Sequence, residues 1–277
     1  MSTMSWIRGV NGTLGWVAPQ MVANRMRQVF MTPRETPPRD WELPLLASAE
    51  RITLRFGLSA LRWGSGPAVL LMHGWEGRPT QFASLINALV EAGYTAVALD
   101  GPAHGRSPGH EANVMLFARA MLEAAAELPP LHAVIGHSMG GASAMLAVQL
   151  GLRTENLVSI AAPARILSVL RGFAKFVGMP ARARSAFIRK IEQEVGIPAS
   201  RLDVAHYQLD MPGLIVHAED DTFVRVSESQ LIHEAWFDSR LLRLETGGHQ
   251  RVLADPRVVE GVLTLLAGRS LQARQSA

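Results

Sequence analysis

GHSMGG, residues 136–141, follows the apolar run Ala133–Ile135 and precedes an alanine-rich stretch that continues to Val148. A strand, a tight turn and a helix in this order form the context of the G-x-S-x-G motif, which presents a serine hydroxyl at the end of a strand. Side chains at positions 136 and 140 would collide with neighbouring backbone in so tight a turn, so glycine is needed at both. The N-terminus of the following helix favours negative charge developing near Ser138. We therefore predict that Ser138 is a nucleophile.

A serine hydroxyl needs a base to accept its proton and a carboxylate to orient that base. His249 is the candidate base, since it follows the apolar run Leu241–Leu244 after a flexible glycine pair, residues 247–248. Taken alone, a histidine in such a loop is typical of exposed surface. Because the chain also supplies an upstream serine and an acid between the two, the order Ser, Asp, His is satisfied and we predict His249 as the base.

The candidate acids follow the apolar run Leu214–Val216, where Glu219, Asp220 and Asp221 are consecutive. One carboxylate is enough to orient an imidazole, so two of the three are expected to be solvated turn residues. The residues alone leave the choice between Asp220 and Asp221 open.

Two backbone N–H groups are predicted to bind a developing oxyanion. His73-Gly74-Trp75 ends the apolar run Ala68–Met72, where the N–H of Trp75 can face the turn together with the N–H of Met139. We interpret His73 as a structural hydrogen-bonding residue. The chain has no cysteine and no HExxH sequence, so no metal site is predicted, and the chemistry expected at Ser138 needs no cofactor.

Short apolar runs alternate with longer amphipathic stretches along the chain. This alternation predicts repeated βα units and therefore a mostly parallel sheet with helices on both faces. Functional loops of such folds lie at the carboxyl ends of the strands, where every motif above falls. The predicted strands are Ile52–Phe56, Ala60–Trp63, Ala68–Met72, Tyr94–Leu99, Ala133–Ile135, Leu157–Ala161, Leu214–Val216 and Leu241–Leu244.

Residues 1–50 are predicted to form one amphipathic helix and an extended connector. Apolar residues at 17, 18, 21, 22, 26, 29 and 30 follow a helical period, and Pro19 suits a first turn. Residues 1–30 contain three arginines and no acid, which leaves contact with an anionic membrane surface as an alternative. We expect the helix to dock onto its own protein instead, as amphipathic helices usually do. Four prolines in residues 31–50 predict the connector.

Residues 164–211 interrupt the strand pattern with two predicted helices, Ile166–Val177 and Arg182–Val195. We interpret this insertion as a small helical cap within a catalytic domain of residues 51–277. It is the most basic part of the chain, which is typical of an exposed outer face. Its apolar residues fit an acyl pocket and a helical core equally well; they are Leu167, Leu170, Phe173, Phe176, Val177 and Phe187.

Composition excludes several classes of protein. Of the 277 residues, 48% are hydrophobic and 18% charged, which suits a sizeable core and argues against disorder. The net charge is only +3 and the arginines are dispersed, so nucleic acid is not an expected partner. The absence of cysteine excludes disulfides and thiolate catalysis. Met1–Val10 lacks the features of a secretion signal and no uncharged stretch reaches transmembrane length, so a cytoplasmic location is expected.

From about Ala68 to Ala267 the chain resembles the α/β-hydrolase superfamily, because four motifs occur in the order found there. They are HGW at 73–75, DGPAHGRS at 100–107, GHSMGG at 136–141 and GH at 248–249. The second is similar to the D-x-P-x-H-G-x-S turn that shapes the site without joining the chemistry. The triad acid of this superfamily commonly ends an H-G-x-x-D pattern. Residues 217–221 read HAEDD, which assigns that role to Asp221, with Ala218 replacing the usual glycine.

The resemblance implies an α/β-hydrolase fold, with a mostly parallel, eight-stranded sheet flanked by helices and a small helical cap. It also implies a serine hydrolase that cleaves a carboxylic ester, thioester or related acyl bond of a small-molecule substrate through an acyl-enzyme on Ser138. Acyl transfer, perhydrolysis, carbon–carbon hydrolysis and aminopeptidase chemistry at the same site stay open, as does a non-catalytic ligand-binding or scaffold protein. Substrate identity and oligomeric state are left open.

Overall fold

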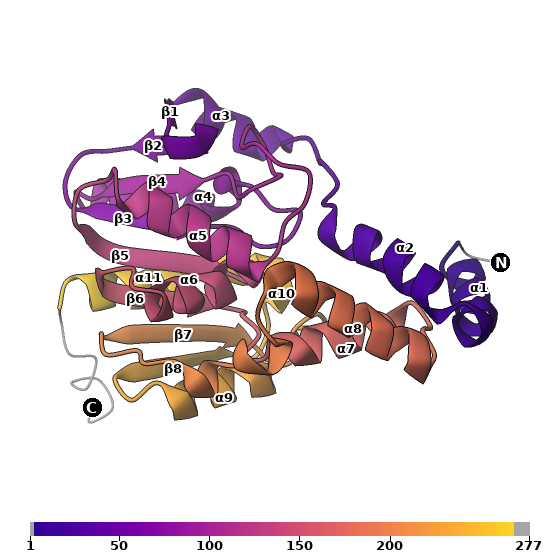
Figure 1. Ribbon diagram of the computed structural model, residues 1–277. Helices are drawn as coiled ribbons and strands as arrows, with labels where there is room; N and C mark the ends of the chain where they lie inside the picture. The colour runs from indigo at the N-terminus through magenta and orange to yellow at the C-terminus, as the bar shows by residue number, and fades with distance from the viewer. Residues whose placement is uncertain (1–2, 269–277) are drawn as a thin grey trace. The chain divides into compact units, whose positions relative to one another are not determined.

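A single twisted sheet organises the larger part of the protein. The computed structural model describes residues 3–268, and within them eight strands are ordered β1-β2-β4-β3-β5-β6-β7-β8 (Figure 1). β2 is antiparallel to β1 and β4, whereas the six strands from β4 to β8 in this order are parallel. The strands are β1 Glu50–Thr53, β2 Ser59–Trp63, β3 Ala68–Met72, β4 Thr95–Leu99, β5 Leu131–His137, β6 Thr154–Ile160, β7 Gly213–Ala218 and β8 Ser239–Leu244.

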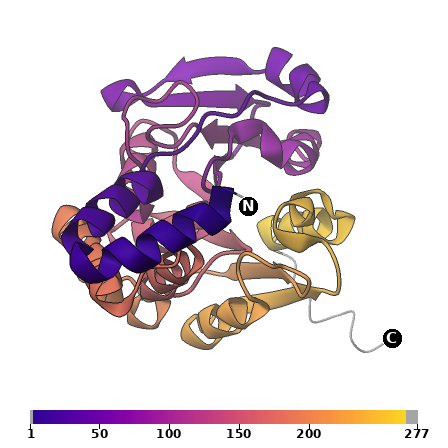
Figure 2. The ribbon, with the colours of Figure 1, turned by 90° about the vertical axis from the view of Figure 1, so that its right-hand side faces the viewer.

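Helices cover both faces of this sheet. α5, α6 and α9 lie on one face, and α4 and α11 lie together on the other (Figures 1 and 2). Every residue of β3 is buried, as expected for a parallel strand covered on both sides. The helices are α1 Thr3–Val17, α2 Pro19–Met31, α3 Leu43–Ala47, α4 Ala83–Glu91, α5 Val114–Ala125, α6 Met139–Gln149, α7 Ile166–Phe176, α8 Ala181–Val195, α9 Val226–Ala235, α10 Gly248–Arg251 and α11 Pro256–Leu266.

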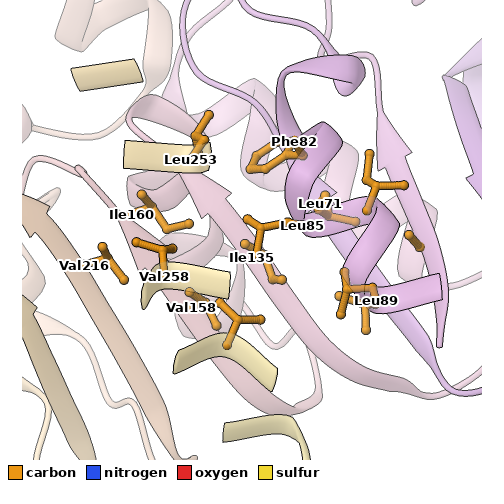
Figure 3. Close-up of a cluster of buried hydrophobic side chains, with 14 of the residues drawn as sticks. Leu71, Phe82, Leu85, Leu89, Ile135, Val158, Ile160, Val216, Leu253 and Val258 are labelled. Atoms are coloured by element: carbon orange, nitrogen blue, oxygen red, sulfur yellow. The ribbon is translucent and has the colours of Figure 1, made fainter. Parts of the chain in front are cut away.

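The main core fills the space between the sheet and the α4–α11 layer. Leu85 and Leu89 of α4 and Val258 of α11 are buried together with Ile135 and Val158 of the central strands (Figure 3). This packing holds the parallel strands in register, and their carboxyl ends consequently meet at one edge of the sheet. That edge is where the candidate site is built.

The chain divides into two compact units. The sheet unit contains residues 34–164 and 207–268, and the helical unit contains residues 3–33 and 165–206. The helical unit has a core of its own, in which Val22 and Met26 of α2 are buried with Leu170 of α7 and Phe187 of α8. The N-terminal helices therefore group with the helices inserted between β6 and β7. Residues 1–2 and 269–277, which the predicted domains include, lie outside the described residues.

The N-terminal segment differs from the sequence prediction. Two helices are present where one was predicted, because Pro19 lacks an N–H and opens α2 after a break at Ala18, whose φ of −135° is not helical. The buried face of α2 also differs from the predicted apolar face. Val22 and Met26 of that predicted face are buried, whereas Met21 is 54% exposed. No helix among residues 3–268 has the length and apolar character needed to cross a bilayer.

The predicted connector, residues 31–50, is extended only in its first part. It then forms a 3₁₀ turn, Asp40–Glu42, and the short helix α3, in which Pro44 occupies the first turn. Glu42 anchors this segment: its buried carboxylate accepts hydrogen bonds from Arg78 at 2.7 Å and from the Thr80 hydroxyl at 2.7 Å. The prolines are compatible with this short helix because proline needs no N–H partner at a first helical turn.

The apolar residues of the inserted helices mostly belong to the core of the helical unit. Leu170, Val177 and Phe187 are buried there, and Leu167 and Phe173 pack against them. Phe176 is 58% exposed. Five of these six side chains therefore serve helix packing within the unit.

Candidate active site

Ser138 lies in a strained turn between β5 and α6. Its backbone has φ 54° and ψ −121°, a conformation that side chains rarely adopt. A Cβ on Gly140 would collide with the carbonyl oxygens of Met72 and His73, and one on Gly136 would collide with the Gly140 carbonyl. The glycines of the motif are thus required by close backbone approach, as the sequence indicates.

The structure brings Ser138, His249 and Asp221 together in one hydrogen-bonded chain. The Oγ of Ser138 lies 2.9 Å from Nε2 of His249, and Nδ1 of His249 lies 2.7 Å from Oδ2 of Asp221. The three residues follow β5, β8 and β7, respectively, at the carboxyl edge of the sheet. With Nδ1–H donated to the carboxylate, Nε2 is free to accept the proton of the serine hydroxyl.

The surroundings of Asp221 favour the ionised form of its carboxylate. Its Oδ1 accepts the N–H groups of Phe223 at 2.8 Å and Val224 at 2.9 Å. Burial opposes ionisation, but the hydrogen bonds from His217, His249 and the Val224 N–H outweigh burial and lower the pKa of Asp221 well below its usual value. The neighbouring Asp220 has a different partner, since its Oδ1 accepts the N–H of Gly248 at 2.6 Å.

Two further histidines, whose importance sequence reasoning missed, support the triad segments. The buried ring of His137 places Nε2 2.7 Å from the carbonyl oxygen of His249, and the donated N–H holds the loop of the candidate base. Nε2 of His217 lies 2.9 Å from the Val224 carbonyl and 3.4 Å from Oδ2 of Asp221. His137 lies inside the elbow motif and His217 opens the HAEDD segment, so the available signal was their position beside candidate catalytic residues.

The segment after β3 packs directly against the elbow. A Cβ on Gly74 would lie 2.8 Å from the Cβ of Ser138, so the backbone leading into Trp75 passes beside Ser138. Met139 is the first residue of α6, whose first-turn N–H groups have no partner within the helix. These positions suit the predicted donors, Trp75 and Met139, and their role in binding an oxyanion stays a prediction.

Histidine side chains join the loops that follow β3 and β4. Nε2 of His73 accepts the N–H of Gly101 at 3.0 Å, and Nε2 of His104 accepts the N–H of Glu76 at 3.0 Å. Both rings are therefore acceptors at Nε2 and neutral. Burial is the main cause that lowers the pKa of His73 to about 3 and also lowers the pKa of His104. His73 thus has the structural role expected from the sequence.

Phe223 is the most exposed aromatic side chain beside the triad. It is 82% exposed, and its ring centroid lies 5.3 Å from that of His249. The ring of Phe223 therefore lies next to the candidate base with most of its surface exposed. Within residues 3–268, no group of three or more His, Asp or Glu side chains is arranged to hold a metal ion.

We predict that the free energy of unfolding falls steeply as the pH drops below about 6.5. Burial is the main cause that lowers the pKa of His73 to about 3 and that of His137 to about 4, from 6.5. Between about pH 4 and pH 6.5 the unfolded chain therefore binds up to about two more protons than the folded protein. The stabilisation is complete above pH 6.5 and is lost at up to about 1.4 kcal/mol per pH unit for each histidine.

Urea denaturation should show that the free energy of unfolding is lower at about pH 5 than at about pH 7 by about 3–4 kcal/mol. His137→Gln is a matched control because glutamine can still donate to the His249 carbonyl but does not titrate. In that variant the dependence of the free energy of unfolding on pH should be about half as steep. Equal stability of the wild-type protein at the two pH values would contradict the prediction.

A family model described as the alpha/beta hydrolase family matches residues 69–262, more than half of the chain. The chain belongs to the alpha/beta hydrolase family. The predicted fold is confirmed, including its eight-stranded, mostly parallel sheet with flanking helices. An alpha/beta hydrolase esterase from Pyrococcus furiosus illustrates the shared fold: it is 21% identical with a TM-score of 0.63, and the similarity covers 86% of this chain and 97% of that one.

Two curated proteins are similar in sequence to this alpha/beta hydrolase. One is the dihydrolipoyllysine-residue acetyltransferase component of the acetoin cleaving system of Cupriavidus necator, 33% identical over 170 residues, or 58% of this chain. The other is the sn-1-specific diacylglycerol lipase ABHD11 of Xenopus tropicalis, 31% identical over 141 residues, or 49% of this chain. The similarity spans 41% of the length of each relative.

Proposed function

We propose that the protein is a serine hydrolase that cleaves a carboxylic ester, thioester or related acyl bond through an acyl-enzyme on Ser138. One observation supports this proposal above all others, namely the continuous hydrogen-bonded chain from the Ser138 hydroxyl through His249 to the buried Asp221 carboxylate. Such a chain activates a hydroxyl that is otherwise a poor nucleophile.

In the proposed acylation step, the Oγ of Ser138 attacks the acyl carbon while its proton passes to Nε2 of His249. Asp221 stabilises the resulting imidazolium and holds its Nδ1–H. The tetrahedral oxyanion is bound by the N–H groups of Trp75 and Met139. Collapse of the intermediate breaks the acyl bond, and the Nε2–H of His249 protonates the departing alkoxide or thiolate.

In the proposed deacylation step, water takes the place of the departed alcohol or thiol. Nε2 of His249 accepts a proton from water as its oxygen attacks the acyl carbon, and the same two N–H groups bind the second oxyanion. Collapse returns the proton to Oγ of Ser138 and releases the carboxylic acid.

The names of the similar proteins support acyl chemistry, since one is a diacylglycerol lipase and the other an acetyltransferase component. The latter makes acyl transfer a second candidate at the same site, with an alcohol, amine or thiol replacing water in deacylation. Product analysis with water and added acceptors in competition separates the two. Hydrolysis predicts the free acid as the main product at every acceptor concentration tested.

A fluorophosphonate probe tests the proposed nucleophile directly. The probe should add covalently to the folded wild-type protein, and peptide mapping should place the adduct on Ser138. Heat-denatured protein is the control, because activation of the hydroxyl requires the assembled hydrogen-bonded chain. Folded protein that resists the probe, or an adduct on another residue, would rule out this mechanism.

A further inference from the structure

The two compact units differ strongly in charge. The helical unit contains eleven Arg and Lys residues and three acidic residues, a net charge of +8, whereas the whole chain has only +3. The rest of the chain is therefore at −5, and the chain contains no acid before Glu35. Eight of the eleven cations lie in the basic insertion, and the fold adds Arg8, Arg25 and Arg27 of α1 and α2 to them. A unit of this charge attracts an anionic partner.

The helical unit also exposes large apolar side chains. Trp6 and Trp16 of α1 are 65% and 62% exposed, Val17 is 80% exposed and Met21, at the start of α2, is 54% exposed. The buried positions of α1 hold Asn11 and Gly15 instead. Ile7 of α1 packs against the core of the unit, whereas Trp6, Trp16 and Val17 lie outward, unlike the apolar residues of a helix that only packs on its own protein. Exposed apolar clusters of this kind mark interaction surfaces.

Basic residues lie where α1 packs against the end of α7. The Nδ2 of Asn11 donates to the Val177 carbonyl at 2.8 Å, which fixes α1 against the end of α7. A Cβ on Gly178 would lie 3.0 Å from the Cα of Arg8, so Arg8 lies beside the turn that follows Lys175. Arg8 and Lys175 are both exposed. Figure 2 shows α1 and α2 joined at one end.

We propose that the helical unit docks on the surface of an anionic lipid bilayer, with α1 lying in the plane of the interface. Trp6, Trp16 and Val17 enter the boundary between headgroups and acyl chains, and the positive charge of the unit, to which Arg8 and Lys175 contribute, attracts acidic headgroups. Tryptophan prefers this boundary because its ring is apolar and its N–H is polar. Basic residues around an apolar helical face are typical of interfacial helices.

A lipid surface fits this unit better than a nucleic acid does. Phosphate groups of a nucleic acid would satisfy the cations, but they offer no environment for aliphatic side chains such as Val17 and Met21. A bilayer satisfies both kinds of group at once. The docking surface makes no use of Ser138, so it stands or falls separately from the proposed acyl chemistry.

Vesicle co-sedimentation of the full chain tests the proposal. The wild-type protein should bind vesicles of phosphatidylcholine and phosphatidylserine at about two to one, bind pure phosphatidylcholine weakly, and lose affinity as salt rises. Trp6→Ser with Trp16→Ser should lower the partition coefficient by about tenfold. Arg8→Glu with Lys175→Glu should lower it by about fivefold or more for each cation removed.

Two variants of the sheet unit serve as matched controls. Trp41 is 54% exposed, so Trp41→Ser removes an equally accessible tryptophan, and Arg153→Glu reverses an exposed cation. Both should bind vesicles as the wild type does. Circular dichroism melting establishes that each variant is folded, and the charge-reversal pair gives an independent test if the tryptophan pair is unstable.

Four results would overturn the proposal. The first is wild-type protein that does not bind phosphatidylserine vesicles at low salt. The second is vesicle binding that falls equally in the helical-unit and control variants. The third is RNA that displaces the protein from vesicles and binds the tryptophan variant as tightly as the wild type, which would show that cationic attraction alone is responsible. A dimer that the tryptophan variant loses, without vesicle binding, would assign the surface to self-association and reject lipid docking.

Discussion

Ser138→Ala is expected to lower kcat for an acyl ester by about 10⁵–10⁶-fold, the largest effect of any single substitution in this protein. Alanine removes the oxygen that forms the acyl-enzyme and leaves His249 with no proton to accept from the elbow. Residual turnover would arise only from substrate binding and the oxyanion donors acting on water. The measurement is hydrolysis of a panel of chromogenic acyl esters of graded chain length, which also defines the acyl preference.

Ser143→Ala is the matched control for this substitution. Ser143 lies on α6 close to the elbow, is fully buried, and its Oγ makes no hydrogen bond within the described residues. Its loss should therefore leave kcat nearly unchanged. Comparable esterase activity in wild type and Ser138→Ala would show that the nucleophile lies elsewhere.

Asp221→Asn is expected to lower kcat by about 10⁴-fold. An amide in place of the carboxylate no longer stabilises the imidazolium, and it favours the wrong tautomer of His249 if its nitrogen faces Nδ1. The loss should appear in kcat more than in KM, because Asp221 contacts His249, His217 and the N–H groups of Phe223 and Val224.

Asp220→Asn provides the comparison that the adjacent acids allow. Asp220 accepts only the Gly248 N–H among the contacts given by the structure, and an asparagine oxygen can accept the same bond. We expect Asp220→Asn to lower kcat by about tenfold or less. If Asp220→Asn were the more damaging of the two, the carboxylate of Asp220 would have to replace that of Asp221 as the orienting group.

The elbow and the order of the triad were predictable because they depend on local sequence. Gly136 and Gly140 are required by a turn of a few residues, and Ser138, Asp221 and His249 each follow an apolar run that is a strand in the structure. Parallel strands then bring distant residues to one edge of the sheet without further information. Strand positions from Ala60 onward were predictable for the same reason. The predicted strand Ile52–Phe56 was wrong, because β1 ends at Thr53 and the chain then forms a 3₁₀ turn, Arg55–Gly57, in which Phe56 has a φ of 56°.

The grouping of α1 and α2 with the inserted helices could not be predicted. It depends on contacts between residues far apart in sequence, such as Asn11 with Val177, which no periodicity encodes. The bond from His137 to the His249 carbonyl is another contact of this kind. In the connector, proline-rich composition suggested extended chain, whereas burial of Glu42 with Arg78 fixes a helical turn.

The strained backbone at Ser138 places activity and stability in opposition at one position. Its positive φ is held by the hydrogen bond from its N–H to the Ile160 carbonyl at 2.8 Å and by the surrounding glycines. Such a conformation destabilises a non-glycine residue by about 1–3 kcal/mol, and glycine would relieve that strain. Directed evolution that selects only for heat resistance would therefore favour replacement of the proposed nucleophile, so thermostable variants of this protein should be selected for turnover at the same time.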